Sequence, residues 1–357
     1  MKNINVPVGI SNFEKIRQDG YYYVDKTGLI KDMLKNKIPE VTLITRPRRF
    51  GKTLAMSMLA SFFDIRRDSK KLFQGLNISK EQQLCNDWMN QYPTLFLSFK
   101  DVDGTIFENA LGLLQFTIAE LCKKHTYLIE SDVVDQDDKE TFRKLKSMGS
   151  NLPELQGSII MLMNMMKAYY NKQVILLIDE YDVPIAKASS NGYYKEMLEV
   201  MKAMLSTALK DNEALKFAVV TGCLKNAKES VFTGTNNFVS DTISSERYNE
   251  YYGFTQKDVD QILQDAQIEE KASDIKEWYD GYRFGEFDVY CPWDVMNYLW
   301  DLTNNQNAKP VSYWKNTSDN AIIRSFIDYS GAAIKKKLRD IDLRWKHQAA
   351  DRRKYLL

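Results

Sequence analysis

The chain has 357 residues, of which 44% are hydrophobic and 12% aromatic, enough for a packed core and too many for global disorder. Its 49 Lys and Arg residues balance 48 Asp and Glu residues, and the formal charge is +1. A net charge this small excludes the strongly basic proteins that bind nucleic acid through their overall charge. It does not exclude a local basic patch that binds nucleic acid. The length fits two domains, or one α/β domain with a helical appendix.

Cysteine and histidine usage narrows the kinds of site that the chain can hold. The four cysteines lie far apart and form no CxxC pair, which argues against a zinc ribbon or a redox motif. With two histidines, a His-rich metal site or a His-based catalytic triad is also unfavoured. The N-terminus lacks the apolar core of a signal peptide, and no apolar run approaches the ~20 residues that span a bilayer. We therefore predict a cytoplasmic protein with reduced thiols and no membrane partner.

Apolar runs of strand length alternate with segments of helical spacing from the N-terminus to about residue 250. This alternation predicts an α/β fold in which helices cover both faces of a parallel sheet. The polar and charged segment 131–152 indicates a surface insertion. The predicted strands are residues 41–45, 94–99, 174–178, 216–221 and 239–243, and the predicted helices are residues 27–35, 53–63, 107–123, 157–170 and 194–209.

The composition changes after Gly253. Residues 255–258 (TQKD) have the form of a capping box that opens a helix. Beyond them Trp and Tyr become frequent and strand signals fade. We therefore predict a first domain over residues 1–250 and a second, mainly helical domain over residues 251–357.

Residues 46–53 (RPRRFGKT) stand between a predicted strand and a predicted helix, and they match the phosphate-loop pattern GxxxxGK[ST] except at the first glycine. The glycine before the lysine lets the backbone approach phosphates, and the N–H groups and dipole of the following helix attract them. The lysine adds charge at the β- and γ-phosphates, and the Thr53 hydroxyl is the expected Mg²⁺ ligand. The alternative is an ordinary strand-to-helix turn with solvated arginines. The residues predicted to bind ATP are Arg46, Pro47, Arg48, Arg49, Phe50, Gly51, Lys52 and Thr53.

A second motif, VILLIDE (residues 174–180), ends an apolar strand with two carboxylates. A carboxylate at such a position is costly to bury unless a ligand uses it. Asp179 is predicted to hold Mg²⁺ beside Thr53, and Glu180 to act as the general base that activates water. The alternative is that both acids cap the next helix. We expect this acidic tip and the bend at residues 50–53 to lie side by side on adjacent strands.

A third, weaker element follows the predicted strand at residues 216–221. Thr221 at its tip is a candidate to contact the γ-phosphate or the attacking water, and a plain strand end is the alternative. Lys225 comes shortly afterwards in a polar segment. A cation there would neutralise charge in the transition state, as an arginine finger does, unless it is only a surface lysine.

Taken together and in order, these motifs resemble the bacterial "AAA-ATPase-like" proteins, a family of predicted ATPases. The resemblance runs from about residue 5 to about residue 335. The motifs that carry it are YVDKT (23–27), RPRRFGKT (46–53), LIDEYD (177–182), AKES (227–230), YGFT (252–255), WYDGY (278–282), YCPW (290–293) and WKNTS (314–318).

The resemblance implies a P-loop ATPase core with an additional strand in its sheet, over residues 1–250, followed by a helical lid domain. It explains Arg46, because RPRRFGKT takes the place of the full glycine pattern in this family. Family members usually carry arginine where Lys225 stands. They also usually continue into a PD-(D/E)XK nuclease-like domain, for which this sequence has no matching residues. Because residues 339–357 do not resemble that continuation, we expect a truncated end.

Each of two further motifs has two possible roles. By analogy with related regulatory ATPases, residues 23–27 pack near the adenine; alternatively Thr27 is a helix N-cap. The aromatic motifs at 278–282 and 290–293 form the core of the lid, or else a surface for a protein or nucleic-acid partner.

These observations predict Mg²⁺-dependent ATP hydrolysis coupled to movement of the C-terminal region. One alternative is a nucleotide-dependent regulatory switch with little turnover, whose C-terminal region contacts a protein partner. Another is the ATPase part of a nuclease-associated system, which the family's fused domain suggests and the neutral charge of this chain does not.

Overall fold

The most apolar runs of the sequence pair into one central sheet. The computed structural model describes residues 4–35, 38–223, 232 and 237–314. It contains a parallel five-stranded sheet in the order β2-β3-β4-β1-β5. Every residue of β1 and β3 is buried, as expected for strands that are covered on both faces. The strands are β1 Val41–Thr45, β2 Thr94–Ser98, β3 Val174–Asp179, β4 Leu215–Gly222 and β5 Phe238–Asp241.

The order of the strands corrects one expectation. β4 lies between β1 and β3 and pairs with both, so the phosphate loop and the acidic tip do not follow adjacent strands. The three strands are parallel and therefore end at the same edge of the sheet, where Thr45 pairs with Gly222. The predicted α/β fold, with an additional strand in a parallel sheet, is confirmed.

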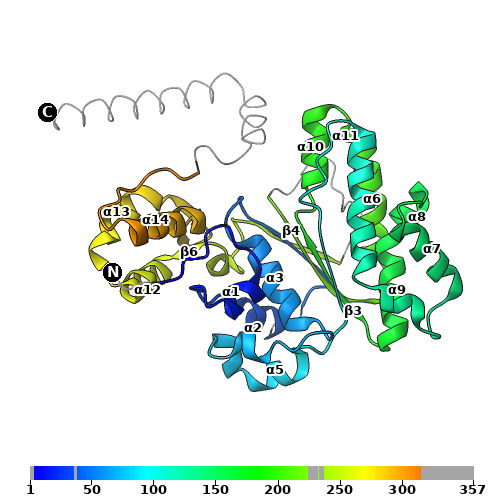
Figure 1. Cartoon of the computed structure of the whole chain (residues 1–357), viewed down its shortest axis with the longest axis horizontal. Helices are drawn as coiled ribbons and strands as arrows, with labels where there is room; N and C mark the ends of the chain where they lie inside the picture. The colour runs from blue at the N-terminus through cyan, green and yellow to red at the C-terminus, as the bar shows by residue number, and fades with distance from the viewer. Residues whose placement is uncertain (1–3, 36–37, 224–231, 233–236, 315–357) are drawn as a thin grey trace. The chain divides into compact units, whose positions relative to one another are not determined.

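Helices cover both faces of the sheet (Figure 1). On one face α3 follows β1, contacts β3 and packs against α1. On the other face α6, α9 and α11 contact β2, β3 and β4 respectively. The helices of this part are α1 Phe13–Gln18, α2 Gly28–Lys35, α3 Lys52–Phe63, α4 Lys70–Phe73, α5 Gln82–Trp88, α6 Phe107–Lys123, α7 Gln136–Lys146, α8 Leu152–Gln156, α9 Ser158–Tyr170, α10 Val183–Asn191 and α11 Tyr194–Leu209.

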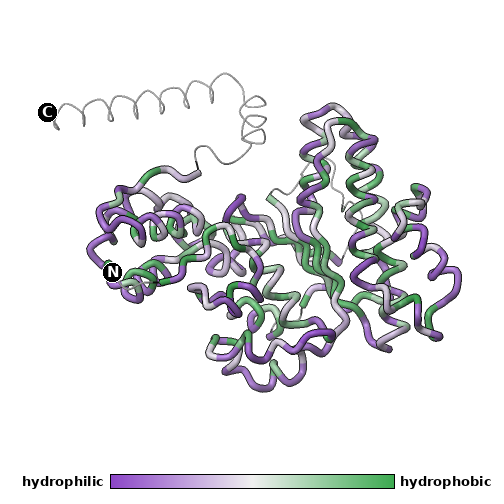
Figure 2. Tube along the Cα trace, in the orientation of Figure 1, coloured by the Kyte–Doolittle hydropathy of each residue, from purple (hydrophilic) through white to green (hydrophobic). Residues whose placement is uncertain are grey.

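The predicted surface insertion at residues 131–152 is instead part of the packed structure. It contains α7, which Asp135 caps by accepting hydrogen bonds from the first backbone N–H groups of the helix. Phe142 and Leu145 of α7 are buried in the same apolar cluster as the strands. The apolar residues are few, but their helical spacing puts them on one face. Figure 2 shows the hydrophobic residues concentrated in the central strands and on the helix faces that meet them.

The described part of the chain after residue 250, up to residue 314, is mainly helical, as predicted, and it also contains a small sheet. Three helices, α12 Gln256–Ala266, α13 Ala272–Tyr279 and α14 Pro292–Asn304, share an apolar cluster of their own. The antiparallel sheet has the order β6-β8-β7 and was not predicted, because its strands are too short for a clear alternation. These strands are β6 Phe254–Thr255, β7 Tyr282–Phe284 and β8 Phe287–Tyr290.

The capping box predicted at the start of α12 is present. The Thr255 hydroxyl accepts a hydrogen bond from the backbone N–H of Asp258, whose carboxylate accepts the backbone N–H of Thr255. Lys26, far away in the sequence, reaches the same carboxylate at 2.6 Å. All of these elements belong to one compact unit, Met1–Tyr313.

None of the helices in the described ranges is both long enough and apolar enough to cross a bilayer.

Candidate nucleotide-binding site

The phosphate-loop sequence forms a bend between β1 and α3. Gly51 stands directly before α3 with φ of 82°, a left-handed conformation that glycine adopts without a steric penalty. Arg49 also has a positive φ, of 71°. The first N–H groups of any α-helix have no intrahelical acceptor, and at the start of α3 no N-cap side chain accepts them either. Such N–H groups, together with the helix dipole, make the start of α3 suited to an anion.

Lys52 begins α3 and its side chain folds back over the bend. Its Nζ atom donates hydrogen bonds to the backbone carbonyl groups of Arg46 and Pro47, both at 2.9 Å. The same atom lies 3.6 Å from the sulfur of Cys223, just beyond β4. The residue is only 5% exposed, so this ammonium group is held inside the curve of the loop.

Asp179, at the end of β3, joins the phosphate loop to β4 although 126 residues separate it from Thr53. The Thr53 hydroxyl donates a hydrogen bond of 2.8 Å to one carboxylate oxygen. The Thr221 hydroxyl donates to the other oxygen. Asp179 and Thr221 are completely buried. The loop and the acidic tip thus lie side by side as predicted, but they are joined through β4, whose Thr221 contacts Asp179 rather than standing apart from it.

Glu180 follows β3 in a left-handed conformation, with φ of 55°. A residue other than glycine in this conformation carries backbone strain, which is common at functional sites. Burial raises the pKa of the Glu180 carboxyl above its ordinary value of 4.5, and the neighbouring Asp179 carboxylate raises it further. The positive charges of Lys52 and Arg48 act in the opposite direction. Glu180 therefore lies within the electrostatic reach of the phosphate loop.

Arg46 does not extend toward the inside of the bend. Its guanidinium group is completely buried and pairs at 2.5 Å with Asp241, at the end of β5. It also donates a hydrogen bond of 2.7 Å to Asn249. The side chain at the first glycine position is thus occupied by protein partners, which corrects the idea that this arginine adds affinity for an anion.

Arg49 and Phe50 also turn away from Lys52. The Arg49 guanidinium lies 4.0 Å from the centre of the Trp293 ring, a cation–π distance. Phe50 is completely buried, and its ring packs against Tyr282 and Phe284 with centroid distances of 4.8 and 5.1 Å. Of the residues predicted to bind ATP, these two can contribute only backbone groups to a ligand at the start of α3.

The chain is similar in sequence to one described protein family. The family described as "Predicted AAA-ATPase" matches residues 7–232, which are more than half of the chain. The chain belongs to this family. The match includes the phosphate loop, the acidic tip and β4, and the family supports nucleotide binding by an ATPase in general terms.

A relative of this predicted AAA-ATPase occurs in Azotobacter chroococcum mcd 1, where it is named "Uncharacterized protein in vnfD 5'region". It is 29% identical over 298 residues, which are 83% of this chain and 52% of that protein. The chain thus spans about half the length of its curated relative.

Several residues around the predicted ATPase loop were not found by sequence reasoning. Asp241 ends β5 in a carboxylate, just as Asp179 ends β3, but the predicted strand 239–243 placed Asp241 in its middle and hid this signal. Asn249 carried no signal, because its partner lies 203 positions away. Asp182 accepts the backbone N–H of Cys223 at 2.8 Å and so ties the turn after β3 to the end of β4. The candidate finger residue Lys225 lies outside the described residues.

The YVDKT motif of the family, residues 23–27, has a packing role. The Asp25 carboxylate accepts hydrogen bonds from the hydroxyl group and backbone N–H of Thr27 and from the backbone N–H of Asn77. The Thr27 hydroxyl accepts the backbone N–H of Ile78 at 3.1 Å. The Thr27 hydroxyl therefore ties the segment before α2 to the turn Asn77–Lys80.

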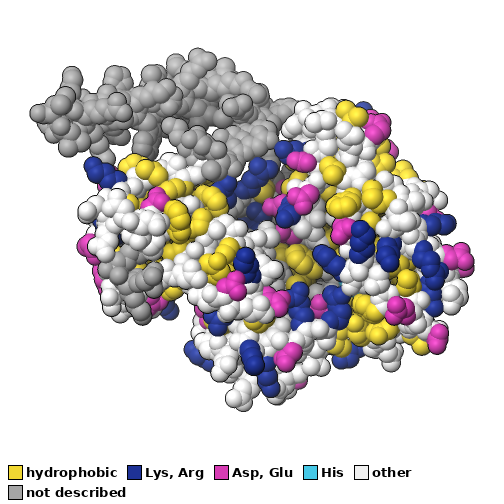
Figure 3. Space-filling model, in the orientation of Figure 1, with side chains coloured by type: hydrophobic (Ala, Val, Ile, Leu, Met, Phe, Trp, Pro, Cys, Tyr) yellow, Lys and Arg dark blue, Asp and Glu magenta, His cyan; other side chains and the backbone are white. Residues whose placement is uncertain are grey.

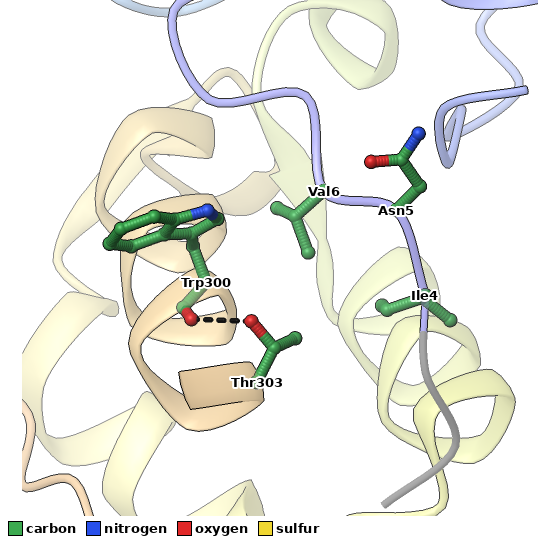
Figure 4. A pocket seen from close by; sticks show the side chains of 5 residues that line it. All are labelled: Ile4, Asn5, Val6, Trp300 and Thr303. Atoms are coloured by element: carbon green, nitrogen blue, oxygen red, sulfur yellow. Dashed lines mark hydrogen bonds between the residues drawn. The ribbon is translucent and has the colours of Figure 1, made fainter. Parts of the chain in front are cut away.

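A separate pocket lies between the N-terminal segment and α14 (Figure 4). It has a volume of about 280 Å³ and contains no residue of the phosphate loop. The residues that line it are Ile4, Asn5, Val6, Trp300 and Thr303. Figure 3 shows basic and acidic side chains interspersed on the face in view, so the described part of that face carries no extended surface of one charge.

Proposed function

We propose that this predicted AAA-ATPase binds ATP with Mg²⁺ at the start of α3 and hydrolyses it. The observation that carries the proposal is the 2.8 Å hydrogen bond between Thr53 and Asp179, which joins the two motifs across 126 positions. In P-loop ATPases these two residue types share the magnesium ion. An ordinary strand-to-helix turn does not require a buried carboxylate at the tip of a different strand.

The triphosphate would lie in the curve of residues 46–53. Backbone N–H groups of the first turn of α3, next to the bend, would bind its β- and γ-phosphate oxygens. Lys52 would exchange its two carbonyl acceptors for phosphate oxygens, a stronger interaction because both partners are charged. The side chains of Arg46 and Phe50 would hold the loop from behind rather than touch the nucleotide.

The donor set suits Mg²⁺. Thr53 and Asp179 offer hard oxygen atoms, and Mg²⁺ in nucleotide sites takes one or two protein oxygens while phosphates and water supply the rest. In the described part of the chain, no cluster of three or more His, Cys, Asp or Glu side chains forms an all-protein cage. The bound ion would neutralise phosphate charge, and Thr53 would supply its hydroxyl oxygen once Asp179 releases it.

Glu180 would act as the general base. It would accept a proton from a water molecule whose oxygen attacks the γ-phosphorus, while the bond from that phosphorus to the bridging oxygen of ADP breaks. Lys52 and the loop N–H groups would balance the charge that develops on the leaving oxygen. Thr221 would position Asp179 through their hydrogen bond, and Lys225 would be the candidate cation beyond the described residues.

The test compares two variants with wild type. We expect Lys52→Ala to abolish binding of ATP and ADP, measured by calorimetry, because the phosphates lose their fixed cation. Glu180→Gln should keep the binding constant within about threefold and lose about 10²- to 10⁴-fold in phosphate release, the range for a general base. Unchanged turnover in both variants would remove hydrolysis as the function.

A regulatory switch with little turnover is the second candidate. The contacts of Arg46, Arg49 and Phe50 with the segment after residue 248 favour it, because they give the loop a direct connection to the C-terminal part. Under this proposal residues 251–357 form a lid that changes its affinity for a protein partner in the cytoplasm. Nucleotide that remains bound through purification, with negligible steady-state release of phosphate, would favour the switch over the enzyme.

A further inference from the structure

Three side chains of the phosphate loop point into the C-terminal part of the chain. They are those of Arg46, Arg49 and Phe50, and four aromatic residues receive them. We call these four the aromatic platform: Tyr252, Tyr282, Phe284 and Trp293.

Phe50 is the centre of this contact. Its ring meets Tyr282 edge to face, with an angle of 70° between the rings, and meets Phe284 at 52°. Both arrangements are favourable for aromatic pairs. Because Phe50 directly precedes Gly51, the position of its ring constrains the backbone at the point where the loop turns into α3.

The two arginines hold the loop on either side of Phe50. Arg49 stacks on Trp293, and Arg46 lies 5.2 Å from the ring centre of Tyr252 and 5.7 Å from that of Phe284. The indole N–H of Trp293 is buried and has no hydrogen-bond partner within the described ranges, so its contact with the loop is through the ring face. Stacked guanidinium groups lose rotamer freedom, and this stiffens the segment to which they belong.

The fit between the loop and this segment is close. A Cβ atom on Gly253 would lie 3.1 Å from Phe50, 3.2 Å from the backbone oxygen of Tyr290 and 3.2 Å from Val289. Usual phosphate loops rely on glycines to shape their backbone, but this loop has a single glycine at residue 51. Its geometry therefore depends on partners outside the loop.

We propose that the aromatic platform, above all Tyr282 and Trp293, positions the phosphate loop for nucleotide binding, so that residues of the C-terminal part determine nucleotide affinity without touching the nucleotide. The proposal builds on the function proposed above. By linkage, bound nucleotide must stabilise the docking of the platform by the same free energy that docking adds to nucleotide binding. The contact is then a route by which occupancy of the loop reaches the C-terminal part.

The experiment replaces platform residues in the full chain and follows two readouts. Tyr282→Leu removes the ring that meets Phe50, Tyr282→Phe keeps it, and Trp293→Leu removes the surface under Arg49. Trp278→Leu is the matched control, because Trp278 belongs to the same segment and is 52% exposed. The readouts are hydrogen exchange of amides 47–53 without nucleotide and calorimetric titration with ADP and Mg²⁺.

We expect amides 47–53 to exchange about tenfold faster in Tyr282→Leu and Trp293→Leu, and ADP to bind about tenfold more weakly. Tyr282→Phe should restore both quantities, and Trp278→Leu should change neither. Exchange in β1 and β3 should stay constant, which separates loop positioning from general loss of stability. If Tyr282→Leu does not fold, the hydrogen exchange and ADP affinity of Trp293→Leu test the proposal.

The experiment distinguishes failure of the positioning role from failure of the proposed function. Wild type that binds ADP while both platform variants keep wild-type exchange and affinity would overturn the positioning role and leave the proposed function intact. Wild type that binds no nucleotide, while the platform variants still speed exchange of the loop amides, would overturn the proposed function and leave the positioning of the loop established.

Discussion

Arg46 is the residue at which this chain departs most from a glycine-rich phosphate loop. A buried guanidinium is costly unless it is paired and hydrogen-bonded, and here Asp241 and Asn249 meet both needs. The arginine thereby connects the first position of the loop to the end of β5. In a glycine-rich loop the first glycine shapes the backbone because it has no side chain. Here Arg46 fixes the same position of the loop through the partners of its side chain.

We expect Asp241→Asn to lower the free energy of unfolding by about 3 kcal/mol, because it leaves the Arg46 charge buried without its counterion. Urea denaturation measures this loss. Asp288→Asn is the matched control: Asp288 pairs with Arg283 at 3.7 Å, but the two side chains are 65% and 68% exposed. Such surface pairs contribute about 0–1 kcal/mol. Equal losses in the two variants would contradict the importance of burial.

His125 gives the chain a calculable sensitivity to acid. Burial, and then the nearby Arg66, lower the pKa of its imidazole from 6.5 to about 3. The unfolded chain takes up a proton below pH 6.5 and the folded chain does not until about pH 3. The stability that the neutral imidazole contributes is therefore complete above pH 6.5 and is lost as pH falls toward 3.

Between about pH 7 and about pH 5 we expect wild type to lose more unfolding free energy than His125→Gln, by up to about 2 kcal/mol, since the variant has no imidazole to titrate. Urea denaturation of both proteins at the two pH values measures the difference. Parallel losses would mean that the imidazole is accessible to protons in the folded state.

At the scale of elements, the site depends on how segments meet. β1, which leads into α3, is parallel to β4, and β4 is parallel to β3. The start of α3, the end of β3 and the end of β4 therefore lie at the same edge of the sheet. Phe50 packs on Tyr282 and Phe284 of β7, and the turn at Gly253 lies directly beside the Phe50 ring. The φ of Gly253 is 100°, and a Cβ atom at this position would lie 3.1–3.2 Å from three neighbouring atoms, so a residue with a side chain would be both strained and crowded there.

We expect Gly253→Ala to reduce both stability and affinity for ADP. The control is Gly192→Ala at the end of α10, which also has a positive φ, of 89°, but has open space around it. Both variants should lose about 1 kcal/mol to backbone strain. Only Gly253→Ala should also displace Phe50 and weaken ADP binding. Denaturation and calorimetry separate the two effects, and equal ADP affinities would show that the crowding is relieved elsewhere.

At the scale of the molecule, bound nucleotide should stabilise the fold as a whole, because the site draws on the central sheet and the loop is in turn packed on the C-terminal part. At ADP and Mg²⁺ concentrations about 100-fold above the dissociation constant, we expect a gain of about 2.7 kcal/mol in unfolding free energy. A rise in melting temperature measures it. Lys52→Ala should show no rise, and a rise of equal size in that variant would place the nucleotide elsewhere.

The amino-acid sequence by itself determined the elements and the motifs. The five strands and the long helices could be predicted because their apolar residues recur with strong periodicity over short distances. The sequence singled out Lys52, Thr53, Asp179 and Glu180 as candidate site residues, because glycine, lysine and paired carboxylates at strand ends have a direct chemical meaning. The short strands β6, β7 and β8 and the helix α7 have too few apolar residues to give such a signal.

Only the tertiary structure decided which of these pieces meet. The insertion of β4 between β1 and β3, the pairing of Arg46 with Asp241, and the packing of Phe50 on Tyr282 all join residues that lie far apart in the sequence. A local sequence pattern indicates which side chains of a segment are buried, but it does not indicate which other segment they pack against. For that reason the sequence of residues 46–50 looks like a basic turn open to a ligand, whereas the fold shows that the side chains of Arg46, Arg49 and Phe50 hold the loop in place.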